Sequence, residues 1–66
     1  MKKKFFRKGD RVVCIKDVYN IKKGMEGMVT KVVLPSIWVD FGEFYGVSEM
    51  RPEEIDLIER QNKKYQ

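Results

Sequence analysis

The chain has 66 residues, of which 42% are hydrophobic and 36% are charged, and its formal net charge is +4. A chain this short forms one domain, since it buries only about 60% of its unfolded surface, and it lacks the run of roughly 20 apolar residues that spans a membrane. Its single cysteine cannot form an internal disulfide, so the composition predicts a reducing, cytoplasmic setting and excludes a cysteine-based metal site.

Residues 1–8 are predicted to form a basic N-terminal arm. The arm resembles the basic start of a secretory signal. However, Arg7 and Lys8 occupy positions where an apolar region of about 7 to 15 residues should begin, so we expect no secretory signal. Phe5 and Phe6 can stack on bases, insert into a partner, or cap an open end of the core. The last of these is the commonest role for an aromatic residue in such an arm.

The first strand is predicted at residues 11–16, after a turn signal at Gly9-Asp10. The segment is rich in β-branched residues and bounded by polar ones, which favours a strand. Val12 and Cys14 share one face, and because the other face is also apolar, we expect the strand to be largely covered on both sides or twisted across a barrel seam. Cys14 is interpreted as a small buried hydrophobe.

The connection at residues 17–23 is apolar for a loop, since it contains Tyr19 and Ile21. Such a loop folds back over the core or presents a contact surface. Two glycines, Gly24 and Gly27, follow it. Glycine tolerates a positive φ and close backbone approach, so this pair predicts a tight, bulged entry into a bent strand.

The second strand is predicted at residues 28–34, and its apolar pattern breaks strict alternation. A bulge near Thr30-Lys31 would allow Val29 and Val32 both to point inward. We therefore expect a long, bent strand, which ends at a turn signal at Pro35-Ser36.

The third strand is predicted at residues 37–41, where apolar and polar side chains alternate cleanly. Ile37, Val39 and Phe41 fall on one face, which we expect to be buried. Trp38 falls on the opposite, outward face.

Two further strands complete the predicted sheet. The fourth is predicted at residues 44–48, with Phe44 on the face opposite the apolar one. Residues 51–54 have a proline followed by acids, which predicts a single 3-10 turn. Residues 55–59 form the closing fifth strand, and residues 60–66 a polar C-terminal tail.

These elements predict one all-β domain over residues 9–59, a small five-stranded antiparallel barrel with a 3-10 turn before the last strand. A barrel removes the exposed edges that an open five-stranded sheet would leave. The alternative, an OB-type barrel, generally has longer strands and often a helix before its fourth strand. The chain has no space for that helix.

Two stretches of the first half carry a family pattern: Gly9-Asp10-x-Val12-x-x-Ile15 and Lys23-Gly24-x-x-Gly27-x-Val29. Together they resemble the KOW motif of the SH3-like barrels found in ribosomal large-subunit proteins and NusG-type transcription factors. By this resemblance Gly27 is the motif's near-obligatory glycine, with Lys23 and Gly24 in the turn before it. The resemblance also implies that the predicted five-stranded barrel is an SH3-like barrel, and that the loop and its basic residues contact RNA or a partner protein.

Charge is distributed unevenly along the chain. Residues 1–34 hold ten Lys/Arg and three acids, a balance of +7, whereas residues 35–66 hold four Lys/Arg and seven acids, a balance of −3. This split favours a basic face that attracts a polyanion, unless folding intermixes the two halves and the lysines only supply ordinary surface charge. For a nucleic acid, with RNA favoured over DNA, the predicted phosphate contacts are Lys2, Lys3, Lys4, Arg7, Lys8, Lys22, Lys23 and Lys31.

Trp38 is the strongest single candidate for a side chain that contacts a ligand. Alternation directs it outward, beside Lys31 and Phe44 on the neighbouring predicted strands, where Trp38 and Phe44 could both stack on bases. The other interpretation is that Trp38 packs against the basic arm. If the chain is instead a protein-interaction module or an accessory subunit of a larger complex, the predicted partner contacts are Tyr19, Trp38 and Phe44.

The sequence does not suggest an enzyme. It contains no histidine, and its few Ser and Thr residues lack a base. Glu53 and Glu54 are adjacent in a predicted turn, so their carboxylates diverge. We therefore expect a non-enzymatic binding module with no catalytic residues, cofactor, metal, small-molecule substrate or membrane partner.

Overall fold

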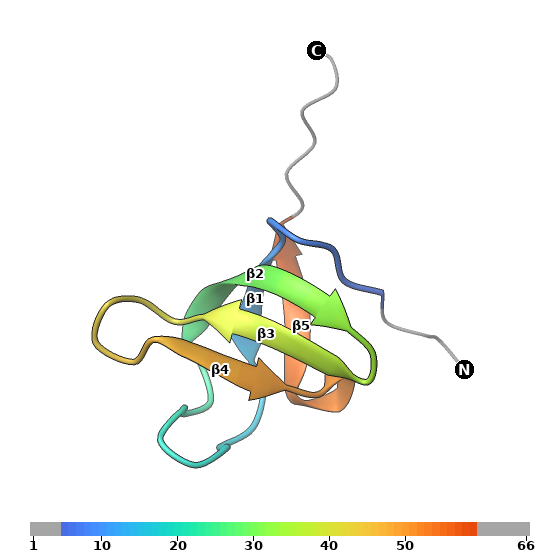
Figure 1. Cartoon of the computed structure of the whole chain (residues 1–66). Coiled ribbons are helices and arrows are strands. Elements are labelled where there is room, and N and C mark those ends of the chain that lie inside the picture. Colours follow the sequence, from blue (N-terminus) through green and yellow to red (C-terminus); the bar gives the residue numbers. More distant parts are fainter. Residues whose placement is uncertain (1–4, 60–66) are drawn as a thin grey trace.

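The computed structural model describes residues 5–59 and shows an all-β protein with one five-stranded antiparallel sheet and one 3-10 turn (Figure 1). The predicted tail at residues 60–66 and the first four residues of the predicted arm lie outside this range. No helix in residues 5–59 is long and apolar enough to cross a membrane. The elements are β1 (Arg11–Cys14), β2 (Glu26–Val33), β3 (Ser36–Asp40), β4 (Val47–Met50), the 3-10 turn η1 (Pro52–Glu54) and β5 (Ile55–Glu59).

The strand order in the sheet is β4-β3-β2-β1-β5. Strands β1 to β4 therefore form a meander, and β5 returns to pair with β1. No pairing between the described strands joins β4 to β5, so the sheet is open and the predicted closed barrel is not confirmed. The chain passes from β4 to β5 through η1, which turns away from β4 and cannot continue its ladder.

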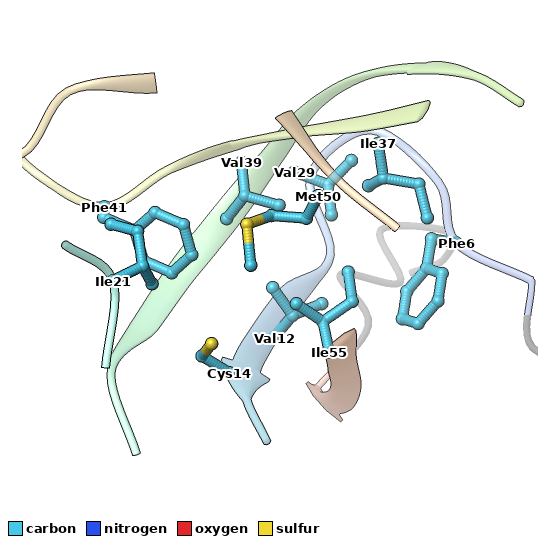
Figure 2. Close-up of a cluster of buried hydrophobic side chains, with 10 residues drawn as sticks. All are labelled: Phe6, Val12, Cys14, Ile21, Val29, Ile37, Val39, Phe41, Met50 and Ile55. Atoms are coloured by element: carbon cyan, nitrogen blue, oxygen red, sulfur yellow. The ribbon is translucent and has the colours of Figure 1, made fainter. Parts of the chain in front are cut away.

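The sheet curls around one hydrophobic core, to which all five strands contribute (Figure 2). Met50 of β4 and Ile55 of β5 are both fully buried, although these strands form opposite edges of the sheet. The inward face predicted for the third strand is confirmed, whereas in β1 Val12 and Cys14 are buried but Val13 on the other face is only partly buried. The buried hydrophobic residues are Phe6, Val12, Cys14, Ile21, Val29, Ile37, Val39, Phe41, Met50 and Ile55.

Loop residues close both ends of this core. In Figure 2, Phe6 lies toward the end of the cluster that contains Ile37 and Ile55, and Ile21 and Phe41 lie toward the other end. Phe6 is only 7% exposed while Phe5 is 66% exposed. The expectation that one aromatic of the arm caps the core is thus confirmed, and that residue is Phe6.

Strand β2 contains the predicted bulge. Val29 pairs with Val39 but Lys31 pairs with Trp38, so Thr30 is the extra residue. The Thr30 hydroxyl donates to the Trp38 carbonyl oxygen over 3.2 Å. Because of this bulge, Val29 is buried and Val32 also packs against the core, as the sequence predicted.

The two glycines around the start of β2 have different roles. Gly24 has a φ of +98°, which provides the turn before the strand. Gly27 lies inside β2 opposite Val12, and a Cβ there would lie 2.7 Å from the backbone oxygen of Asp40 and 2.7 Å from Val39 Cγ1. Gly24 is therefore required by the turn, and Gly27 by the close approach of β3.

The predicted start of the fourth strand is wrong. Residues 41–46 form a loop, and β4 begins only at Val47. Gly42 and Gly46 have φ values of +104° and +74°, which an extended strand does not accommodate. The Gly46 N–H donates to the Gly42 carbonyl oxygen over 2.6 Å, which closes the loop on itself. Phe44 accordingly lies in a loop and not on a strand.

The segment before β1 is closed by a buried carboxylate and is attached to the sheet by backbone hydrogen bonds. Asp10 is 1% exposed, and its side chain accepts a hydrogen bond from the Arg7 N–H over 2.9 Å. The Gly9 N–H donates to the Val29 carbonyl oxygen, and the Val29 N–H donates to the Asp10 carbonyl oxygen, each over 2.8 Å. The predicted Gly9-Asp10 turn thus also joins the segment to β2 next to its bulge.

Replacing Gly27 tests the close approach of β2 and β3. We expect Gly27→Ala to lower the free energy of unfolding by about 3 kcal/mol, because the new methyl group meets the backbone oxygen of Asp40 and the buried side chains of Val39 and Phe41. Gly42→Ala is the control, since a Cβ there meets nothing within 4 Å and only its positive φ is penalised, by about 1 kcal/mol. Urea unfolding of both variants measures the difference. An equal or smaller loss for Gly27→Ala would contradict this role.

Candidate binding surface

The structure separates the cations that the sequence predicted for nucleic-acid binding. Residues 5–10, which include Arg7 and Lys8, lie at one end of β1, and residues 17–23 lie at the other (Figure 1). Lys22 and Lys23 are exposed at that second end. The predicted contacts Lys2, Lys3 and Lys4 lie outside the described residues.

Trp38 lies on the outward face of the sheet, in a row of three side chains. It is opposite Lys31 of β2 on one side and opposite Glu49 of β4 on the other. Trp38 is partly buried, whereas Lys31 and Glu49 are exposed. Since directly opposite side chains touch across antiparallel strands, the indole is flanked by a cation and an anion.

A second row on the same face also alternates in charge. Asp40 of β3 pairs with Met28 of β2, which pairs with Arg11 of β1, which in turn pairs with Glu59 of β5. The Arg11 guanidinium also forms an ion pair with Glu26 over 2.8 Å. The outward face is therefore mixed in charge rather than basic.

The charge balance of the described residues supports this conclusion. Residues 5–59 hold eight Lys/Arg and ten Asp/Glu, a balance of −2, and the remaining residues, 1–4 and 60–66, hold six Lys/Arg and no acids. The strand order places β3 directly beside β2, and β5 directly beside β1, so strands from the acidic half of the sequence pair with strands from the basic half. The two halves are intermixed by folding, so the split seen along the chain does not produce a basic face on the sheet.

The turn at residues 18–21 presents Tyr19 to the solvent. Val18 and Ile21 each donate an N–H to the other's carbonyl oxygen, over 2.8 and 2.9 Å, and Ile21 is anchored in the core. Tyr19 is 94% exposed and has a φ of +54°. A bulky residue is strained in this left-handed region, so the turn displays an aromatic ring at a conformational cost.

A groove, here called the edge groove, runs between this turn and β4 and continues to η1. Its first part has a volume of about 240 Å³ and is lined by residues 18–21 and by Ser48, Glu49 and Met50. Its second part has a volume of about 390 Å³ and is lined by Val18, Tyr19, Glu49, Arg51, Glu53 and Glu54. Both parts share Tyr19 and Glu49. The sequence did not predict this groove, because its walls come from segments far apart in the chain.

Phe44 does not lie on a strand beside Trp38, contrary to the prediction. It is 89% exposed in the loop at residues 41–46, where its ring meets the edge of the Tyr45 ring at a centroid distance of 5.2 Å. The loop starts beyond the end of β3 at Asp40. Phe44 and Trp38 therefore do not form the joint stacking platform that alternation in the sequence suggested.

No family model matches this chain, and no significant match was found among curated proteins or solved structures. Within residues 5–59, no three His, Cys, Asp or Glu side chains are grouped so that they could hold a metal ion. The functional interpretation therefore rests on the geometry of the edge groove and of the outward face.

Trp38 fluorescence tests the surroundings of the indole, because Trp38 is the only tryptophan. We expect Lys31→Ala to shift its emission to longer wavelength and to increase quenching by acrylamide, since the opposite side chain no longer covers the ring. Phe44→Ala should leave both unchanged. A response to Phe44→Ala that equals the response to Lys31→Ala would contradict the placement of Phe44 away from Trp38.

Proposed function

We propose that this chain is a non-enzymatic binding module with an SH3-like barrel fold and a KOW-type entry into its second strand. The meander β1 to β4, the return of β5 to β1 and the 3-10 turn between β4 and β5 are consistent with this fold. The position of Gly27 supports the resemblance, since β3 approaches it too closely for any side chain. Fold alone does not identify a ligand, so the ligand is argued from the surface.

The proposed ligand is a protein partner that contacts Tyr19. The observation that carries this proposal is the combination of 94% exposure and a φ of +54° at Tyr19. Gly or Asn would occupy the same turn with less strain, and burial of the ring contributes almost nothing to this fold. Strain of about 1 to 3 kcal/mol is typical of residues that serve a function outside the fold.

The edge groove beside Tyr19 adds to this proposal. Exposed tyrosines next to a groove are frequent anchors of protein interfaces, because they bury a large apolar area and lose few rotamers. The negative charge balance of residues 5–59 disfavours a polyanion at this site. Of the predicted partner contacts, Tyr19 therefore has the strongest support.

Tyr19→Asn separates the binding role from stability. We expect this variant to retain or slightly raise the urea midpoint, since Asn tolerates a positive φ, and to weaken binding of a captured partner by at least about tenfold. Capture from nuclease-treated lysate followed by calorimetric titration of the purified partner measures this. Phe44→Ala is the matched control, because Phe44 is almost as exposed but lies in another loop. Equal binding by Tyr19→Asn and the wild type would refute the proposal.

A nucleic acid, with RNA ahead of DNA, is the second candidate ligand. The specific observation is that Lys31 lies opposite Trp38 on the outward face. The hydrogen bond from Gly9 to Val29 brings the exposed Arg7 and Lys8 to the part of β2 that leads into Lys31. The three cations and the indole together supply phosphate contacts and a stacking surface.

Charge reversal distinguishes RNA binding at this second site from non-specific attraction of RNA to the net positive charge of the chain. We expect Lys31→Glu to weaken binding of a mixed-sequence RNA and to lower the slope of log affinity against log salt by about 1 or more. Lys22→Glu makes the same change in net charge at the other end of β1 and should have a smaller effect. Fluorescence anisotropy at several salt concentrations measures both. Absence of binding at low salt, or equal effects of the two variants, would exclude this candidate.

A further inference from the structure

We propose that the edge groove binds an extended segment of a partner protein, which adds a strand to β4 and carries a Lys or Arg side chain facing Glu49 and η1. This inference rests on the proposed protein-binding function and specifies the chemistry of the partner. It combines three features of the same region: an open strand edge, a groove alongside it, and an excess of negative charge.

The first feature is the free edge of β4. This strand pairs only with β3 and is the last strand in the sheet order. The Phe41 N–H donates to the Gly46 carbonyl oxygen, so these two residues form a hydrogen-bonded pair at the start of the ladder. In an antiparallel ladder every second residue of a strand bonds to its neighbour, and the residues between them direct their N–H and C=O groups to the other side. The backbone groups of Val47 and Glu49 therefore point away from β3. Neither residue takes part in the backbone hydrogen bonds that described residues make outside the strands. An added strand would satisfy these groups.

The second feature is the space beside that edge. The turn at residues 18–21 faces β4 from below in Figure 1, and the two line the first part of the edge groove together. This turn satisfies its own backbone through the reciprocal Val18–Ile21 bonds, so it does not pair with β4. The resulting space, about 240 Å³, is open to an extended chain with β4 on one side and Tyr19 on the other.

The third feature is charge. Three acidic residues, Glu49, Glu53 and Glu54, line the second part of the groove together with one basic residue, Arg51. Glu49 accepts a hydrogen bond from the Ser36 hydroxyl, and Glu54 accepts one from the Arg51 N–H over 2.8 Å, so both carboxylates are held in place. Glu53 is exposed. This arrangement complements a basic side chain and repels phosphates or an acidic segment.

The same charges disfavour a second copy of this chain as the occupant. Antiparallel pairing of β4 with β4 about a two-fold axis brings the two Glu49 side chains close to each other across the new ladder. Like charges in that position are destabilising. A different protein with a basic extended segment fits the groove better.

Peptide selection tests the predicted chemistry directly. Short random peptides displayed on phage are selected against the full-length chain, and the selected peptides are synthesised. We expect sequences that contain Lys or Arg and few prolines, and we expect their binding to slow amide hydrogen exchange at Val47 and Glu49. Failure to select any peptide, or selection of acidic or proline-rich peptides, would overturn the inference.

Two pairs of variants then test the contacts with a selected peptide. Val47→Pro removes an N–H at the first residue of an edge strand, a position where proline is tolerated, and Val47→Thr retains that N–H. Glu53→Lys reverses a charge in the groove, and Asp40→Lys makes the same change on the outward face. We expect Val47→Pro and Glu53→Lys each to weaken binding by about tenfold, and their controls to change it by less than about twofold.

Failure of this inference is distinguishable from failure of the proposed function. If Val47→Pro binds the peptide as well as Val47→Thr does, strand addition is wrong. If Glu53→Lys binds it as well as Asp40→Lys does, recognition of a basic side chain is wrong. In both cases a partner whose binding requires Tyr19 still supports a protein-binding module. If Tyr19→Asn leaves partner binding unchanged, the proposed function itself fails. Circular dichroism and urea unfolding of each variant show that it is folded before binding is compared.

Discussion

The close contact between β2 and β3 at Gly27 is the constraint on which the rest of the structure depends. With no side chain at this position, the Asp40 carbonyl oxygen and the Phe41 ring lie directly against β2. Phe41 belongs to the same buried cluster as Ile21 (Figure 2). Ile21 in turn anchors the turn that displays Tyr19 in the core.

The bulge at Thr30 has a comparable effect on the outward face. By inserting one residue, it returns Val32 to the core side and places Lys31 opposite Trp38. The same part of β2 holds the segment before β1 through Gly9 and Asp10. A local irregularity therefore determines both how the core is filled and which charges flank the indole.

These two features explain why function is better sought at the edge of the sheet than on its face. On the outward face, cations and anions alternate from strand to strand, which limits the field that a polyanion experiences. At the edge, the backbone groups of Val47 and Glu49 point away from β3, and Glu49 lines the edge groove together with Tyr19 and Glu53. An open strand edge is normally a liability in a protein. Here it borders Tyr19, the most exposed aromatic residue within residues 5–59.

Local patterns in the sequence were sufficient to predict most of the secondary structure. Alternation at residues 37–41 predicted the buried face of β3, the broken pattern at residues 28–34 predicted the bulge in β2, and Pro52 with its following acids predicted η1. Each of these signals arises from a residue and its near neighbours. The fourth strand was misplaced because a loop with two glycines in positive φ resembles a short apolar strand when only composition is considered.

The sequence by itself thus determined the all-β class, the number of strands and most of the inward-facing residues, because strand periodicity and turn chemistry act over a few residues. Only the tertiary structure decided the candidate site. The edge groove combines residues 18–21 with residues 48–54, and the mixed charge of the outward face results from the order in which the strands pair. Neither is encoded in a contiguous stretch, since both depend on which distant segments the fold brings together.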